Sequence, residues 1–383
     1  MKRVSSSNAT VARGTGRDCA MSVTSAPSPL RYRHASGLHA VTGALHALHY
    51  ELLRSTGDDR NQVRTSVMNL VAACTDRSRG DGAAADLLRI GMRHPARAII
   101  IVANAEHEPQ LEADLSLHSG VDDNRVCTEL VRLEVQGEPA YHLISIVAPL
   151  LIPDMPVYLW VVGASPLQQP FTDEVIALVE RIILDSGEYA DVAETLALLS
   201  SQLEKRGGRL PLADVAWQRT QLWRELIAQA FDPAAARAWL RNISDVSIRC
   251  AGSGASSDSW LLGGWMGSRL GWTRGRSPRL SIAGDGAPHA TENTPAIALL
   301  DRLTEVRIHA QRGDDVAEVS LERRGDSIHT SIDIPRTMSA ARTVSLPRRD
   351  EADLLSSMMA EGGDDAVYRA AIANAAALAA AWG

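Results

Sequence analysis

The stretch LLIPDMPVYLWVVG at residues 150–163 decides the fold of this chain. Pro153 and Pro156 flank Asp154 and hold the backbone extended, because proline fixes its own φ and restricts the residue before it. The run 157–162 that follows is apolar and rich in β-branched and aromatic residues, including Trp160. The pattern predicts a turn that leads into a strand buried on both faces.

Helical patterns flank this strand on both sides. Residues 140–150 are apolar at helical spacing. In FTDEVIALVER at residues 171–181, Thr172 is placed to cap a helix whose first turn carries Asp173 and Glu174. A buried strand between two helices is typical of α/β domains, so we expect a mixed sheet flanked by helices.

The remainder of the first half supplies the other elements of this sheet. We predict helices at 36–53 and 82–92, and strands at 62–73, 97–103, 111–118 and 127–135. The last two strands alternate apolar and polar residues, which favours an antiparallel pair. Residues 1–35 form an N-terminal arm; residues 1–33 within it lack apolar periodicity, and we expect the arm to be disordered. The first α/β domain is therefore expected at 36–170.

The second half predicts an α+β domain at 171–383. The pattern RIIL at 181–184 fits either a helix extension or a short strand. We expect helices at 192–203, at 211–231, at 256–272 with Ser257 or Asp258 as its cap, and at 366–382, where an alanine-rich helix docks on the second domain. A strand at 243–250 and alternating runs at 305–311, 316–323 and 328–334 predict a β-meander.

Composition and charge exclude several classes of protein. The net charge of −7 and the pI of about 5.9 argue against nucleic acid or an anionic membrane as a partner. No apolar run reaches the length of a membrane span, and the N-terminus lacks the apolar block of a signal peptide, so we expect a cytoplasmic protein. The four cysteines are scattered without a C-x-x-C motif, which fits a reducing compartment: Cys19, Cys74, Cys127 and Cys250.

The usual signatures of catalysis are missing. Lys2 and Lys205 are the only lysines, and neither lies in a P-loop or in a setting that suits Schiff-base chemistry. No dinucleotide fingerprint, serine-hydrolase elbow or zinc motif follows the predicted strands. We therefore expect neither a catalytic residue, nor a cofactor, nor a resident metal.

Four weaker features have a structural and a functional interpretation. His39, His46 and His49 could form a metal site, but solvated histidines on a helix explain the same spacing better. The turn at 252–254 could hold a phosphate, although its third glycine is replaced by Ser257. Asp154 and Asp185 could serve as an acid or base, but a turn-capping role is favoured for both. Trp217 and Trp223 could be interface anchors, and core anchoring is again favoured.

Six blocks occur in a characteristic order along the chain: RTSVMNLVA at 64–72, HPARAIIIVA at 94–103, LISIVAPLLIPDMPVYLWVVG at 143–163, RIILDS at 181–186, DVAWQRTQLWRELIAQAFD at 214–232 and LLGGWMGSRLGW at 261–272. Together these blocks resemble the OpcA family, the glucose-6-phosphate dehydrogenase assembly proteins of cyanobacteria and actinobacteria. Within them IPDMPVYLW and LWRELIAQ are the most specific parts of the resemblance.

The resemblance implies a non-catalytic protein that binds glucose-6-phosphate dehydrogenase, favours its active oligomer and thereby supports the oxidative pentose phosphate pathway. Candidate partner-binding residues lie in the stretch 150–163 and in the helix expected at 211–231: Pro153, Asp154, Pro156, Trp160, Trp217, Trp223, Arg224 and Glu225. The alternatives are a sugar-phosphate or nucleotide enzyme that uses arginine ligands and an aspartate acid or base, and a scaffold without effect on activity.

Overall fold

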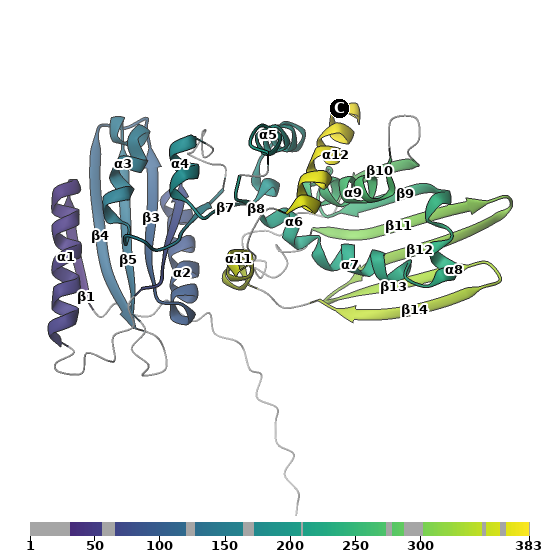
Figure 1. Cartoon of the computed structure of the whole chain (residues 1–383), viewed down its shortest axis with the longest axis horizontal. Helices are drawn as coiled ribbons and strands as arrows, with labels where there is room; N and C mark the ends of the chain where they lie inside the picture. The colour runs from purple at the N-terminus through teal and green to yellow at the C-terminus, as the bar shows by residue number, and fades with distance from the viewer. Residues whose placement is uncertain are drawn as a thin grey trace, which may run out of the picture.

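The computed structural model describes residues 31–55, 66–119, 127–163, 172–207, 210–272, 278–286, 302–346, 350–360 and 365–382. These residues form two β-sheets that lie side by side (Figure 1). Four helices lie between the sheets: α5 (Val192–Lys205), α6 (Val215–Arg219), α11 (Glu351–Ala360) and α12 (Ala366–Trp382). The arrangement confirms an α/β protein with a mixed sheet and a second part that contains a meander.

The first sheet has eight strands in the order β1-β4-β5-β3-β2-β6-β7-β8. The six strands at one side of this order, β5-β3-β2-β6-β7-β8, are all parallel to their neighbours. At the other side, β4 pairs antiparallel with both β5 and β1. The strands are β1 (Arg31–Ser36), β2 (Met68–Cys74), β3 (Ala96–Asn104), β4 (Gln110–Ser119), β5 (Cys127–Gln136), β6 (Val157–Val161), β7 (Arg181–Leu184) and β8 (Leu212–Asp214). The predicted antiparallel pair is confirmed as β4 and β5, and RIIL is a strand.

Both faces of this sheet are covered by helices because its central strands are apolar on both sides. The helices on one face are α1 (Leu38–Ser55), α3 (Leu143–Val147), α4 (Asp173–Leu178) and α5 (Val192–Lys205). Those on the other face are α2 (Arg77–Arg93) and α11 (Glu351–Ala360). Thr172 caps α4 as predicted, since its side chain accepts a hydrogen bond from the Val175 backbone N–H.

Two expected boundaries are corrected by the sheet. Residues 1–30 lie outside the described part of the chain, but β1 pairs with β4 from Arg31 onward, so a strand begins inside the arm expected at 1–35. The domain boundary expected at 170 falls inside the first sheet, because β7 and β8 complete it. The sequence does not reveal these pairings, because β1, β7 and β8 are short and their partner strands lie far away along the chain.

The second sheet has six strands in the order β10-β9-β11-β12-β13-β14. They are β9 (Ile243–Cys250), β10 (Arg279–Gly284), β11 (Leu303–Arg312), β12 (Asp315–Arg324), β13 (Ser327–Ile334) and β14 (Met338–Ser345). The meander of β11, β12 and β13 is confirmed and extends to β14. One face packs on α7 (Gln221–Ala230), α8 (Ala234–Arg237) and α9 (Ser257–Leu270).

The long helix expected at 211–231 is wrong. The segment forms β8, then α6 (Val215–Arg219), then α7 after a break at Thr220. Asp214 caps α6 through the Ala216 backbone N–H, and the Thr220 hydroxyl donates to the Trp217 carbonyl at 2.7 Å, which ends α6. The apolar spacing predicted a single helix, but residues 212–214 at the start of the segment pair with β7 as a strand.

The C-terminal helix α12 (Ala366–Trp382) joins the two halves. It packs against α9 and against α5, and both of these helices lie within residues 171–383, so the expectation that it docks on the second domain is confirmed. A Cβ at Gly264 of α9 would overlap the Ala371 carbonyl oxygen, so this glycine permits the close packing of the two helices. The cap of α9 is Ser256 instead of Ser257 or Asp258.

Candidate partner-binding site

The turn before β6 is exposed and rigid. Pro153, Asp154 and Pro156 are all exposed, and Asp154 has φ 60°, a conformation that aspartate adopts more readily than most residues. Behind the turn, the fully buried Asn69 side chain accepts from the Ile152 N–H at 2.8 Å and donates to the Ile152 carbonyl at 3.1 Å. The turn therefore presents its three side chains on a fixed backbone.

Asn69 is a residue that the sequence reasoning missed. It stands alone as a polar residue within the apolar strand MNLVAAC, and that isolation was the available signal. A buried amide must find hydrogen-bond partners, and here it finds them in the backbone of the turn.

The three tryptophans among the candidates lie in the interior of the chain. Trp160 is 6% exposed, Trp217 is 5% exposed and Trp223 is fully buried. Trp160 packs in the core between the first sheet and α2, while Trp223 belongs to the core beneath the second sheet. Core anchoring, the favoured interpretation of Trp217 and Trp223, agrees with these positions.

Arg224 and Glu225 differ in their surroundings. The Arg224 guanidinium lies over the Trp217 ring at 3.4 Å from its centroid, and its Nε donates to the Thr220 hydroxyl at 3.1 Å. Glu225 is exposed and accepts a hydrogen bond from the Gln221 side chain at 2.9 Å. The structure thus brings Arg224 and Trp217 together within the chain and leaves Glu225 on the surface of α7.

A buried ionic cluster joins the two halves, and the sequence reasoning missed its centre, Arg219. The Arg219 side chain is 4% exposed and donates to both oxygens of Asp185, at 2.7 and 2.8 Å, and to Asp258 at 2.7 Å. Burial opposes the charge of Arg219, but the two carboxylates hold its pKa above the usual value. No local pattern reveals this cluster, because its members lie far apart in the sequence.

The environment of Asp185 argues against an acid or base role. Burial raises the pKa of Asp185, but the Arg219 guanidinium outweighs burial and the net pKa lies below the ordinary value. Its Oδ1 also accepts from the Gly187 backbone N–H at 2.8 Å. A carboxylate that is ionised and held by an arginine is a poor proton carrier at neutral pH.

In parallel sheets, ligands bind at the carboxyl ends of the strands. At this edge Asp76 follows β2 and caps α2 through the Arg79 backbone N–H. The Arg79 side chain lies against Gly163, where a Cβ would overlap its guanidinium, and it donates to Glu188 at 2.9 Å. The side chain of Arg79 therefore occupies the space beside the β2 and β6 ends.

The glycine turn after β9 is also filled by the chain itself. Gly284 packs so closely that a Cβ there would overlap the Gly252 carbonyl oxygen, and the Gly286 N–H donates to that oxygen at 3.0 Å. The backbone at 284–286 occupies the position that a phosphate would need, which favours a plain strand-to-helix turn.

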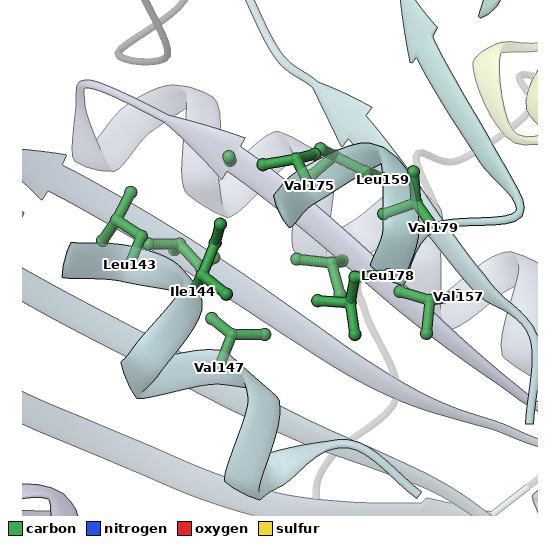
Figure 2. A pocket seen from close by; sticks show the side chains of 11 residues that line it. Leu143, Ile144, Val147, Val157, Leu159, Val175, Leu178 and Val179 are labelled. Carbon is green, nitrogen blue, oxygen red and sulfur yellow. The ribbon is translucent and has the colours of Figure 1, made fainter. Parts of the chain in front are cut away.

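An apolar groove lies between α3 and α4 on the first sheet (Figure 2). Its lining is entirely aliphatic: Val71, Ala73, Ile101, Leu143, Ile144, Val147, Val157, Leu159, Val175, Leu178 and Val179. A sugar-phosphate or nucleotide site needs polar groups that orient the ligand. The chemistry of this groove suits an apolar group and does not suit such a substrate.

The described residues contain no group of three histidine, cysteine or acidic side chains that could hold a metal ion. Cys74 and Cys250 are buried free thiols, and burial raises the pKa of Cys74 to about 11, which makes its thiolate scarce. Within the described ranges, no helix has the length and apolar character that crossing a bilayer requires.

Two family models match the chain. One describes the N-terminal domain of the glucose-6-phosphate dehydrogenase subunit and matches residues 89–201. The other describes the C-terminal domain of the same subunit and matches residues 210–372. Both are OpcA models, and together they cover more than two thirds of the chain.

Curated relatives match a shorter stretch. The OxPP cycle protein OpcA of Synechocystis sp. is 26% identical over 188 residues, and that of Nostoc punctiforme is 27% identical over 187 residues. Each match covers 48% of this chain and 39% of the relative. The match thus spans about two fifths of the length of these relatives.

Solved structures resemble this chain only weakly. Glucose-6-phosphate 1-dehydrogenase from Mycobacterium avium gives a TM-score of 0.44 at 12% identity, over 80% of this chain and 90% of that one. Myo-inositol dehydrogenase from Lactobacillus casei gives 0.37 at 10% identity, over 82% and 93%. Nothing about function follows from likenesses of this size.

Proposed function

The chain belongs to the OpcA family, whose models describe domains of a glucose-6-phosphate dehydrogenase subunit, and from this premise we propose that it is a non-catalytic assembly factor of that dehydrogenase. It binds the dehydrogenase, favours its active oligomer and acts as an allosteric activator in the oxidative pentose phosphate pathway. The observation that carries the proposal is the pair of family matches, which together run through both halves of the chain.

The mechanism is a shift of population. A protein that binds the active oligomer better than other states stabilises it by the difference between the two binding free energies, and by no more. Such a role needs a stable surface and no proton carrier. The proposal is supported by the side chains at the carboxyl edge, where Asp185 and Arg79 already have partners within the chain.

The turn at 153–156 is the contact that we propose for the dehydrogenase. Its exposed Pro153, Asp154 and Pro156 are held in one conformation by Asn69, so binding costs little conformational entropy. Glu225 on α7 is the second exposed candidate. Trp160, Trp217, Trp223 and Arg224 contribute by holding the elements that carry this surface, since their side chains pack within the chain.

The test uses the purified full chain and the dehydrogenase of the same organism. Reduction of NADP by glucose 6-phosphate is followed for each protein alone and for the mixture, and the oligomeric state of the dehydrogenase is measured by light scattering. We expect no turnover by the chain alone, a lower substrate concentration for half-maximal rate in the mixture, and a shift toward the larger dehydrogenase oligomer.

Two other results would each support an alternative function. Turnover by the isolated chain, freed of contaminating dehydrogenase, supports the enzyme interpretation instead. Binding without any change of rate or oligomer supports a plain scaffold. We also propose a cytoplasmic location, because an assembly factor must lie in the same compartment as the dehydrogenase that it binds.

A further inference from the structure

One face of the second sheet is not covered by any described helix. The helices α7, α8 and α9 pack on the opposite face, where the apolar side chains point. We call the uncovered side the open face; the described positions that make it up are Asp245, Ser247, Arg249, Arg279, Ser281, Ala283, Glu305, Arg307, His309, Glu318, Ser320, Glu322, His329, Ser331, Asp333, Ser339, Ala341 and Thr343. Each of these residues is exposed or half-buried.

The strand register orders the open face into three rows that cross the sheet. The middle row pairs Ser281 with Ser247, Ser247 with Arg307, Arg307 with Ser320, and continues through Ser331 to Ala341. Arg307 is the only long side chain in this row, and its guanidinium bends to Glu305 at 2.5 Å. A middle row of small side chains lets a second surface approach to the roughly 10 Å at which sheets pack face to face.

The size of the open face suits a specific interface. Six strands spaced by about 4.8 Å and six to ten residues long at about 3.3 Å per residue cover on the order of 800 Å². A standard protein interface buries about 800 Å² on each partner.

The charges on either side of the middle row are complementary. On β9, Asp245 lies two residues before the middle-row residue Ser247, and Arg249 lies two residues after it. The same spacing places His309 and Glu305 on β11, and it places Asp333 and His329 on β13. In each of these three strands one end is acidic and the other is basic or can be protonated.

A twofold axis along the middle row exchanges the two ends of every strand. With the strands of two copies aligned, Asp245 of one copy then faces Arg249 of the other, and the reverse contact forms at the same time. On β12 the axis places Glu318 opposite Glu322, and Arg307 of the neighbouring β11 lies in register between them. The pattern is self-complementary on β9, β11 and β13, as an isologous contact requires, whereas on β12 the axis brings two glutamates together.

From the exposed area and this charge pattern we propose that the open face binds a second copy of the same chain, sheet against sheet, about a twofold axis that runs along the middle row. This inference goes beyond the proposed function, because it concerns self-association and needs no dehydrogenase. The two contacts between Asp245 and Arg249 form its ionic part, and the small middle row forms the close contact.

Two single charge reversals and their mixture test this geometry. Sedimentation velocity of the full-length chain over a concentration series should show a monomer–dimer equilibrium. Asp245→Arg sets arginine against Arg249 twice in each dimer, and Arg249→Asp sets aspartate against Asp245 twice, so each variant alone should dimerise at least about tenfold more weakly. An equimolar mixture of the two variants restores both opposite-charge contacts and should dimerise nearly as well as the unmodified chain.

Glu174→Arg is the matched control, because Glu174 is exposed on α4 and lies away from the open face. It should leave the equilibrium unchanged. A chain that stays monomeric at every concentration overturns the proposal, as does a mixture that associates no better than its two components. If both single reversals weaken binding of the dehydrogenase and leave self-association unchanged, the open face belongs to the dehydrogenase and the proposal is again wrong.

Discussion

The hydroxyl group of Tyr368 in α12 donates a hydrogen bond of 3.0 Å to Oδ2 of Asp214 at the end of β8. Both side chains are buried. Oδ1 of the same carboxyl accepts from the backbone N–H groups of Ser186 and Ala216, each at 3.0 Å. One carboxyl group therefore connects β8, the turn after β7, the start of α6 and the C-terminal helix.

This connection predicts a pH-dependent stability. Burial, and then the nearby Asp185 carboxylate, raise the pKa of Asp214 from 3.8 to about 6. The folded state holds this proton more tightly than the unfolded chain, so the contribution is fully present below about pH 4 and is lost as the pH rises through about 6. The free energy of unfolding of wild type minus that of Asp214→Asn should thus increase by up to about 2 kcal/mol between pH 7 and pH 4.5. Urea unfolding at a series of pH values measures it, and parallel curves for the two proteins would contradict it.

For the turn at 153–156, one variant should lower the stability of the chain and another should lower only its affinity for the dehydrogenase. Asn69→Ala leaves the Ile152 N–H and carbonyl without their partner and should lower the free energy of unfolding by about 1–3 kcal/mol. Asp154→Lys changes an exposed side chain and should leave stability within about 0.5 kcal/mol while weakening dehydrogenase binding. Thermal melting and a binding titration of each variant separate the two effects. Unchanged affinity for Asp154→Lys would remove the turn from the proposed contact.

Arg224 and Glu225 are neighbours that should respond differently to alanine. Arg224→Ala removes the contact with the Trp217 ring and the hydrogen bond to Thr220, which should cost about 1–2 kcal/mol of stability. Glu225→Ala is the matched control and should change stability by less than about 0.5 kcal/mol. Urea unfolding compares them, and affinity for the dehydrogenase is measured only on folded protein. Equal stability of both variants would show that Arg224 has no structural role.

Two glycines of α9 test the packing of α12. In Gly264→Ala the new methyl group overlaps the backbone of α12, and we expect a loss of about 1–3 kcal/mol. At Gly267 an added Cβ would lie 3.4 Å from the Asn374 side chain, an ordinary contact, so Gly267→Ala should be neutral or stabilise by up to about 1 kcal/mol through helix propensity. Thermal unfolding distinguishes them. A tolerated Gly264→Ala would show that α12 can move away from α9.

Deletions from the N-terminus should show a sharp boundary. Removal of residues 1–30 should leave folding and activation of the dehydrogenase nearly unchanged, because that segment lacks apolar periodicity. Removal of residues 1–36 also takes β1, whose residues pair with β4 from Arg31 to Ser36, and should lower the melting temperature. Loss of activation by the shorter deletion with a normal melting curve would place a contact in the arm.

The sequence by itself determined the elements whose patterns are local. The apolar run after Pro156 is β6, Thr172 caps α4, and the alternation in the second half forms the meander. Each of these follows from residues a few positions apart, because buried strands, caps and hairpins depend on neighbouring side chains. The turn at 153–156 was predictable for the same reason, since two prolines restrict its backbone.

Only the tertiary structure decided the features that depend on distant partners. Residues 212–214 leave the helical pattern because β7 pairs with them. The same holds for Arg219, whose two carboxylates come from different elements, and for Asn69, whose partners lie more than eighty residues away. Burial and ionic pairing depend on which segments meet in space, and a pattern of neighbouring residues carries no information about that meeting.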